Sequence, residues 1–207
     1  PAGKGAERRD RYLFRKKRRC AAPMSRKEVT MMETTLLSDF PIFAGMPPEV
    51  FEAIARDAVV RSHEAGSVLF EEGDMASELF GLLEGEVELS ILFRDRVLKA
   101  DVRHEEYVHK RFEIIETELV FDTIEPGEIF AWSALVAPHQ LTSNARCTQP
   151  SKVMALPAGS LADLFEQAPR SGSVFMQRLA GVIAQRLRHR TDKLVESWYE
   201  AFGEERL

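Results

Sequence analysis

The sequence predicts a mainly β fold with flanking helices, arranged as an antiparallel sandwich or jelly roll. Between Val59 and Ile91, short apolar runs are separated by turn signals about eight to twelve residues apart, a spacing typical of such folds. A short helical pattern precedes this region over residues 47–55, and a long one follows Pro169. The strands are therefore expected in the middle of the chain and the helices at its two ends.

The first helix is expected over residues 47–55, because Pro47 and Pro48 suit a first helical turn and Glu49 places an acid near its start. The strands that follow are separated by tight turns at Gly73 and Gly85, since glycine reaches positive φ without steric cost.

The segment 92–123 mixes strand-like and strongly charged stretches. Phe112-Glu113-Ile114 and Leu119-Val120-Phe121 are typical of strands, whereas residues 94–111 carry many charges. We expect either a long hairpin or a charged excursion between two strands.

The last elements are a strand over residues 152–157, a short helix over 160–165 with Ser160 as its cap, and a long helix from about Ser171. Apolar residues recur along the long helix at three-, four- and seven-residue steps: Phe175, Leu179, Ile183, Leu187, Leu194, Trp198 and Phe202. This stripe either covers the β domain or forms a dimer seam, and its length favours a homodimer. Four basic residues lie on the other face, which we expect to be solvated: Arg186, Arg188, Arg190 and Lys193.

Composition places the chain among ordinary globular proteins, with 44% hydrophobic and 29% charged residues in 207. No apolar run reaches the roughly 18–20 residues of a membrane span. Cys20 and Cys147 lie far apart and show no metal-ligand spacing, which favours a reducing, cytoplasmic location.

Charge is distributed unevenly along the chain. Residues 1–27 contain eleven Lys and Arg against two acids, so this segment carries +9 and the other 180 residues carry −14 of the net −5. The basic tail is either a contact for nucleic acid or an anionic membrane, or a solvated leader, and we favour the leader. Met24 would be a plausible start of the natural reading frame.

Catalytic signatures are absent from the sequence. Ser133 and Ser143 have no accompanying histidine–acid pattern, and the phosphate-loop and dinucleotide fingerprints are missing. The five histidines are scattered and predict no metal site. We therefore expect no enzyme, no catalytic residues and no metal.

Four stretches, taken in their order along the chain, carry a resemblance to a known family. They are residues 40–43, 66–74 and 79–87, and Pro126-Gly127-Glu128-Ile129-Phe130 with the residues that follow. Together with the long helix, residues 36–200 resemble the cyclic nucleotide-binding domains of catabolite-activator-type regulators, kinase regulatory subunits and gated channels. The resemblance implies an eight-stranded double-stranded β-helix (jelly roll), a phosphate-binding cassette with a short helix inside it, and a long C-terminal helix.

The cassette positions implied by the resemblance are Gly127, Glu128, Phe130, Ala131, Trp132, Ser133, Ala134, Leu141, Thr142 and Ser143. Gly127, Glu128 and Phe130 match the family pattern, and Thr142 keeps a hydroxyl. Ala131 stands where a glycine is usual, Trp132 where a carboxylate grips the ribose, and Leu141 where an arginine neutralises the cyclic phosphate.

Losing one partner of a buried charge pair costs about 2–5 kcal/mol, so a micromolar ligand would become millimolar or weaker. Arg146 lies five residues beyond Leu141 and would reach an anion only if the strand register slipped. Trp132 either plugs the pocket or stacks on an aromatic or apolar ligand, and plugging is the favoured interpretation.

Three regions are predicted: a basic tail over 1–30, the jelly-roll domain over 31–170, and the C-terminal helix over 171–207. The predicted function is a regulatory or sensory module with an altered cassette, which binds a cyclic nucleotide weakly, or another small ligand. The alternative is a ligand-free structural protein that binds an unknown protein partner through its C-terminal helix. Because the sequence ends at Leu207, we expect no helix-turn-helix domain and no DNA binding through one.

Overall fold

The structure is a computed structural model that describes residues 29–31, 34–104 and 107–202, so the basic tail up to residue 28, including Met24, lies outside the described residues. The strands are β1 (Val29–Met31), β2 (Val59–His63), β3 (Val68–Phe70), β4 (Glu78–Glu84), β5 (Val87–His104), β6 (Tyr107–Ile124), β7 (Ile129–Phe130), β8 (Asn144–Cys147) and β9 (Ser151–Pro157). The helices are α1 (Thr34–Leu37), α2 (Pro48–Asp57), α3 (Ala158–Gln167) and α4 (Pro169–Phe202), with 3-10 helices η1 (Pro41–Phe43) and η2 (Trp132–Leu135).

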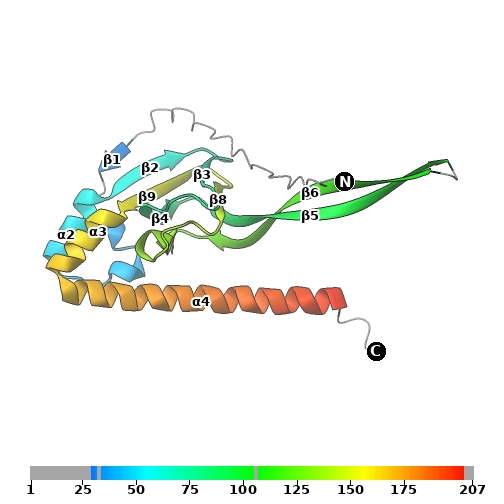
Figure 1. Ribbon diagram of the computed structural model, residues 1–207. Coiled ribbons are helices and arrows are strands. Elements are labelled where there is room, and N and C mark those ends of the chain that lie inside the picture. Colours follow the sequence, from blue (N-terminus) through cyan, green and yellow to red (C-terminus); the bar gives the residue numbers. More distant parts are fainter. Residues whose placement is uncertain (1–28, 32–33, 105–106, 203–207) are drawn as a thin grey trace, which may run out of the picture.

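The strands form two antiparallel sheets, in the orders β1-β2-β9-β4-β7 and β3-β8-β5-β6 (Figure 1). This confirms the mainly β fold with flanking helices and a long C-terminal helix. The described residues hold nine strands rather than the expected eight, because β1 adds an edge strand beside β2. β1 also spans the predicted boundary between residues 30 and 31.

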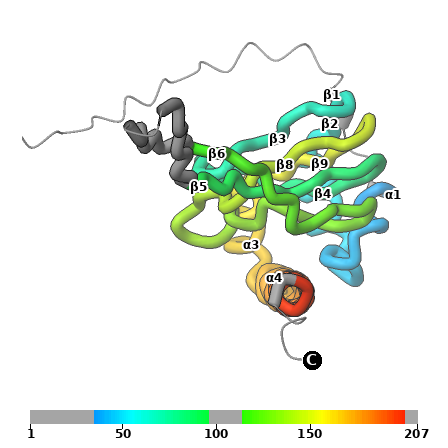
Figure 2. Tube along the Cα trace, turned by 90° about the vertical axis from the view of Figure 1, so that its right-hand side faces the viewer, coloured from blue at the N-terminus to red at the C-terminus, as the bar shows by residue number. Residues whose placement is uncertain are grey.

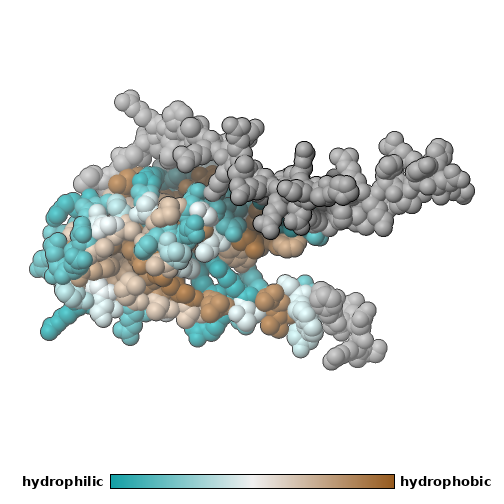
Figure 3. All heavy atoms as spheres, viewed as in Figure 1, coloured by the Kyte–Doolittle hydropathy of each residue, from teal (hydrophilic) through white to brown (hydrophobic). Residues whose placement is uncertain are grey.

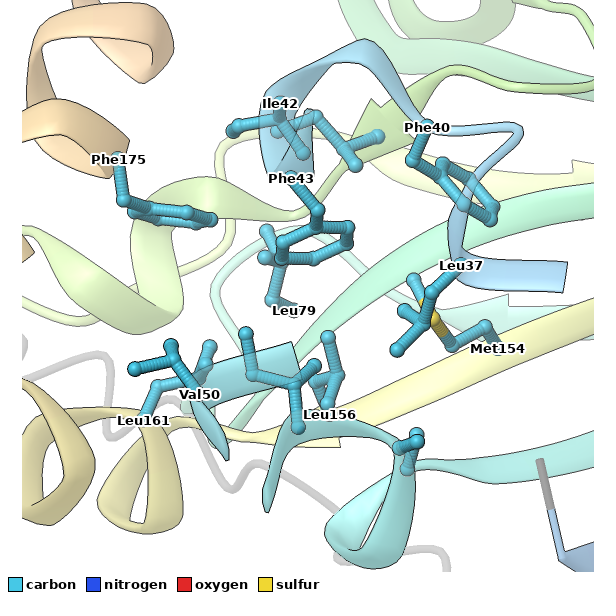
Figure 4. Packing of buried hydrophobic residues seen from close by; sticks show 14 of the residues in the cluster. Leu37, Phe40, Ile42, Phe43, Val50, Leu79, Met154, Leu156, Leu161 and Phe175 are labelled. Atoms are coloured by element: carbon cyan, nitrogen blue, oxygen red, sulfur yellow. The ribbon is translucent and has the colours of Figure 1, made fainter. Parts of the chain in front are cut away.

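Two hydrophobic clusters form the core, and the five-stranded sheet separates them. Side chains between the two sheets include Leu82, Phe130 and Val153. Side chains between the five-stranded sheet and the helices include Leu79, Met154 and many residues of α1, η1, α2 and α4 (Figure 4). Strand β9 is buried on both faces, which is why its apolar residues run consecutively instead of alternating.

The first half of α4 is fixed against this core by aromatic and polar contacts. The ring of Phe175 stacks on Phe43 with centroids 5.7 Å apart and contacts Phe165 at 5.0 Å (Figure 4). The guanidinium of Arg178 donates to two backbone carbonyls of η1 and its C-cap, those of Ile42 and Ala44. The long helix thus begins as part of the domain and not as a separate appendage.

Gly85 makes the predicted tight turn between β4 and β5, with φ of +94°. A Cβ there would lie 2.6 Å from the Pro150 carbonyl oxygen and 2.7 Å from the Ser151 Cα, so both backbone conformation and space require glycine. By contrast, the prediction of Ser160 as a helix cap is wrong. Helix α3 begins two residues earlier at Ala158, after Pro157, and Ser160 lies inside its first turn.

The segment 92–123 is a long β-hairpin, one of the two expected arrangements. Strands β5 and β6 have 18 residues each and extend the four-stranded sheet well beyond the barrel (Figure 1). Figure 2 looks along α4 and shows this helix end-on, on one side of the sheets. A β-bulge interrupts the pairing, because Leu89 pairs with Asp122 and Ser90 pairs with Val120, which leaves Phe121 as the extra residue. Past the bulge, exposed apolar side chains share one face of the hairpin: Ile91, Phe93, Ile115 and Leu119.

None of the described helices combines the length and the apolar character that crossing a bilayer demands.

Candidate functional site

The cassette begins with the glycine turn that the sequence predicts. Gly127 has φ of +89° and lies between β6 and β7. Its N–H donates to the Leu82 carbonyl over 2.8 Å, and the Leu82 N–H donates to the Glu128 carbonyl over 3.0 Å. These two bonds hold the turn against β4, so the cassette is anchored to the five-stranded sheet.

A short helix follows the turn, also as expected. Ala131 adopts a left-handed conformation with φ of 58° and ψ of 33°, and η2 runs from Trp132 to Leu135. Left-handed geometry is easy for glycine but costs a residue with a Cβ about 1–2 kcal/mol. The alanine therefore keeps the backbone path that a glycine would follow, at the expense of local strain.

Leu141 lies in the hydrophobic cluster between the two sheets and is 7% exposed. Its backbone is fixed on both sides: its N–H donates to the Asp74 carbonyl over 2.9 Å, and its carbonyl accepts from the Gly73 N–H over 2.8 Å. Leu141, at the position where the family resemblance leads us to expect an arginine, is thus a packed core residue.

Arg146 does not replace that arginine. On β8, the neighbouring Ala145 and Cys147 are fully buried, whereas Arg146 is exposed and lines a different, outer cavity of about 690 Å³. Its guanidinium lies 3.9 Å from the Glu118 carboxylate on that outer face. The strand register therefore directs Arg146 away from the cassette.

A cavity of about 190 Å³ lies beside the cassette, between the barrel and α4. It is smaller than the roughly 300–1,000 Å³ usual for sites that enclose drug-sized ligands. Its lining residues come from the barrel, the cassette and the helix: Phe70, Leu89, Ala131, Trp132, Ser133, Leu141, Thr142, Ser143, Ile183, Arg186, Leu187 and Arg190. The structure thus brings together six of the ten predicted cassette positions around one space.

The other four predicted positions do not line this cavity. Phe130 is fully buried and stacks on Phe80 with ring centroids 5.5 Å apart. Ala134 is buried in η2, and its carbonyl lies 3.1 Å from the His139 ring nitrogen Nδ1. Gly127 and Glu128 line a neighbouring cavity of about 400 Å³ on the other side of the cassette.

Positive charge reaches the small cavity from α4 and not from the cassette. Arg186 Nη1 donates to Asp122 Oδ2 over 3.1 Å, and Arg190 Nη2 donates to the same oxygen over 3.5 Å. Arg186 is only 8% exposed. The prediction that the basic face of the long helix is solvated is therefore wrong for Arg186, because Asp122 on β6 draws it into the barrel.

The carboxylate of Glu128 also faces Arg186. Its Oε2 lies 3.2 Å from Arg186 Nη2, close enough for an ion pair but poorly aligned for a hydrogen bond, and it accepts the Glu125 N–H over 2.9 Å. Two acids and two arginines thus join β6, the cassette and α4. Because arginines four residues apart lie on the same helix face, the pair at 186 and 190 was the sequence signal for this cluster.

Trp132 lies between the core and this charged cluster. Its ring packs against the cluster under the helices, and the Arg186 guanidinium sits 5.5 Å from the ring centroid. Arg190 similarly lies 4.3 Å above the ring of Phe121. Trp132, at the position where the family resemblance leads us to expect a carboxylate, therefore packs against the core and forms part of the cavity wall.

Within the described ranges, no group of three histidine, cysteine or acidic side chains is placed to hold a metal ion.

Residues 60–168 match the family model of the cyclic nucleotide-binding domain, and this match covers more than half of the chain. Among curated proteins, no relative was found. Among solved structures, the chain is similar to a putative cyclic nucleotide-binding protein from Geobacter metallireducens, with 28% identity and a TM-score of 0.58. That likeness covers 76% of this chain and 99% of the other.

Two more distant structures share the fold. A cyclic nucleotide-binding domain from Methylobacillus flagellatus has a TM-score of 0.59 at 15% identity, and the match covers 79% of this chain and 81% of that one. The catabolite activator protein of Thermus thermophilus has a TM-score of 0.53 at 21% identity. Here the match covers 77% of this chain but 64% of the activator.

Proposed function

Because the chain belongs to the cyclic nucleotide-binding domain family, we propose that it is a non-catalytic regulatory module whose cassette is altered and no longer holds a cyclic phosphate. The single observation that carries this proposal is the burial of Leu141 in the core, at the position where the family pattern has its phosphate-binding arginine. A phosphate placed against Leu141 would meet an apolar side chain there, and the two arginines on the helix side of the cavity already face the carboxylates of Asp122 and Glu128.

The size of the adjoining cavity supports the same proposal. At about 190 Å³ it is below the volume that encloses larger ligands, and the ring of Trp132 takes up part of the site. We expect the affinity for cyclic AMP and cyclic GMP to be millimolar or weaker.

Calorimetry tests this directly. The full chain is titrated with cyclic AMP, cyclic GMP and a cyclic dinucleotide, and no binding at micromolar concentration is expected. Micromolar binding of either cyclic mononucleotide by the unmodified chain would refute the altered cassette.

A double variant separates a lost site from a closed one. Trp132→Glu with Leu141→Arg introduces the family's carboxylate and arginine, and Trp132→Gln with Leu141→Met serves as the size-matched neutral control. If only the charged groups are missing, the first variant gains binding of cyclic AMP and the control does not. No gain in a variant with an unchanged circular dichroism spectrum would mean that the cavity itself is closed.

The output of the module would be a change in how α4 lies against the barrel, biased by the occupant of the cavity. Helix α4 is suited to this role because it contacts the cavity and then continues away from the barrel. Its 34 residues span about 51 Å, and apolar side chains of the distal part are exposed: Leu187, Leu194, Val195, Trp198 and Tyr199.

These exposed residues also support the proposal of a homodimer through α4. Space-filling Figure 3 shows apolar residues continuing along the helix where it leaves the barrel. The alternative function, a ligand-free protein that binds a different partner through the same helix, is favoured by this surface too. A mass measurement in solution distinguishes them, because the homodimer needs no second component.

A further inference from the structure

The cluster on α4 leaves one of its buried donors without a partner. Asp122 Oδ2 accepts from both Arg186 and Arg190, while Asp122 Oδ1 accepts the Thr123 N–H over 3.0 Å. Within the described part of the chain, two buried guanidinium nitrogens make no hydrogen bond: Arg186 Nη2, which faces Glu128 Oε2 at 3.2 Å as an ion pair, and Arg190 Nε, which faces no acid. A buried donor without an acceptor is unfavourable, so an additional acceptor beside Arg190 would be stabilised by a new hydrogen bond.

Both arginines line the small cavity beside the cassette. The Arg186 side chain is 9% exposed and the Arg190 side chain 34% exposed, so one is enclosed and the other stands at the rim. An acceptor that entered the cavity would therefore meet donors from the helix side.

The remaining walls are mostly apolar. Leucine, isoleucine and aromatic side chains surround the space, and three hydroxyl-bearing residues belong to the cassette side: Ser133, Thr142 and Ser143. A cavity of about 150 Å³ is known to accept benzene, so about 190 Å³ suits one aromatic ring with one small substituent. The volume is too small to enclose a purine together with its ribose and phosphate.

We propose that this cavity binds a small apolar monocarboxylate of the size of benzoate, with its carboxylate held by Arg190 and Arg186 of α4. The proposal rests on the proposed function, in which the cassette no longer holds a cyclic phosphate. A planar carboxylate matches the paired N–H groups of a guanidinium, and the ring would lie among Phe70, Leu89 and Leu141.

Binding would act on the position of α4. The contact between Arg190 and Asp122, at 3.5 Å, is the longer of the two arginine contacts to that oxygen, so a ligand carboxylate would compete there first. The ligand would thus replace the Arg190–Asp122 contact between the helix and the barrel with its own contact to Arg190. Binding of the ligand would therefore weaken the attachment of α4 to the barrel.

Calorimetry and ligand-observed NMR on the full chain test the proposal with benzoate as the probe. Benzamide is the neutral analogue of matched shape, and cyclic AMP is titrated in parallel. We expect saturable binding of benzoate, with benzamide weaker by tenfold or more, because charge-assisted bonds to a guanidinium are lost.

Variants locate the site. Arg190→Gln should weaken benzoate binding by tenfold or more, and Arg190→Lys should restore part of it. Arg188→Gln is the matched control, since Arg188 lies on the same helix and is exposed to solvent. Arg186→Gln should weaken benzoate binding as Arg190→Gln does. Because Arg186 is buried, however, its substitution also removes a contact between α4 and the barrel. The test therefore depends on Arg190, whose variants leave the Arg186–Asp122 contact in place.

Absence of saturable benzoate binding to the folded chain would overturn this inference, and so would equal binding of benzamide or equal weakening by Arg188→Gln. None of these results affects the altered cassette. That proposal fails on a different result, micromolar binding of cyclic AMP, so the two failures are distinguishable.

Discussion

The two halves of α4 carry one amphipathic pattern but lie in different surroundings. In the first half, Phe175 and Leu179 are at most 1% exposed because they pack on η1 and α3. In the second half, Leu194 and Trp198 are 70% and 59% exposed, although they continue the same stripe. A helical pattern thus identifies which face seeks apolar contact, but it does not reveal whether the contact lies within the same chain.

The largest expected effect comes from Phe175 in the packed half. Phe175→Ala removes a fully buried ring between Phe43 and Phe165 and should lower the free energy of unfolding by about 4 kcal/mol. Leu194→Ala in the exposed half should change it by less than about 0.5 kcal/mol. Urea denaturation at one protein concentration measures both, and similar losses would mean that the halves are not different.

Substitution of Asp122 tests whether its ion pairs attach α4 to the barrel where the packed half of the helix meets the exposed half. Asp122→Asn removes the carboxylate that pairs with Arg186 and Arg190, and although Glu128 still faces Arg186, losing this buried partner should cost about 3 kcal/mol. Glu116→Gln is the control on the same strand, because its pair with Arg94 is exposed on the surface. If both variants unfold at the same urea concentration, the buried pair does not hold α4 to the barrel.

Much of the fold and of the cassette could be predicted from the sequence, because glycine turns and apolar spacing are local signals. Gly85 and Gly127 mark turns that the structure contains at those positions. The hairpin was only half predicted. Its strands leave the barrel, and the many charges of residues 94–111 are compatible with either a strand or a loop.

The cluster around Asp122 could not be predicted, since it joins residues 64 and 68 positions apart. Arg186 has the sequence context of a solvated arginine, and its burial depends on an acid from another element. The same reasoning applies to Arg146, whose direction is set by the register of β8. Charged residues therefore reveal their roles only once the topology is known.

The exposed half offers a smaller effect on association. If α4 forms the dimer seam, Trp198→Ala should raise the dissociation constant of the dimer about 30-fold, as expected for a buried aromatic worth about 2 kcal/mol at an interface. Sedimentation equilibrium measures it, with exposed Glu196→Ala as the control. A chain that stays monomeric at every concentration would contradict the homodimer and favour a different protein partner for the second half of α4.

The smallest effect concerns the cassette, which meets α4 at Trp132 between the two halves. Ala131→Gly relieves the left-handed strain but increases the freedom of the unfolded chain, so it should stabilise the protein by about 0.5–1 kcal/mol. Thermal unfolding measures the change, and Ala134→Gly, inside η2, should destabilise instead. Destabilisation by both would show that the turn is not strained.

The alternation of side chains sets a counting rule for the hairpin arm. Because side chains alternate between faces, the arm can change length by two residues per strand, about 6.8 Å at a time, and still present Ile91, Phe93 and Leu119 on the same side. One residue added to each strand at the base of the arm would turn these side chains to the other face. Deleting Phe121 would not, because it would only remove the bulge and make Leu89–Asp122 and Ser90–Val120 consecutive pairs. Arms of different reach can therefore be made by design, provided that each strand gains or loses an even number of residues.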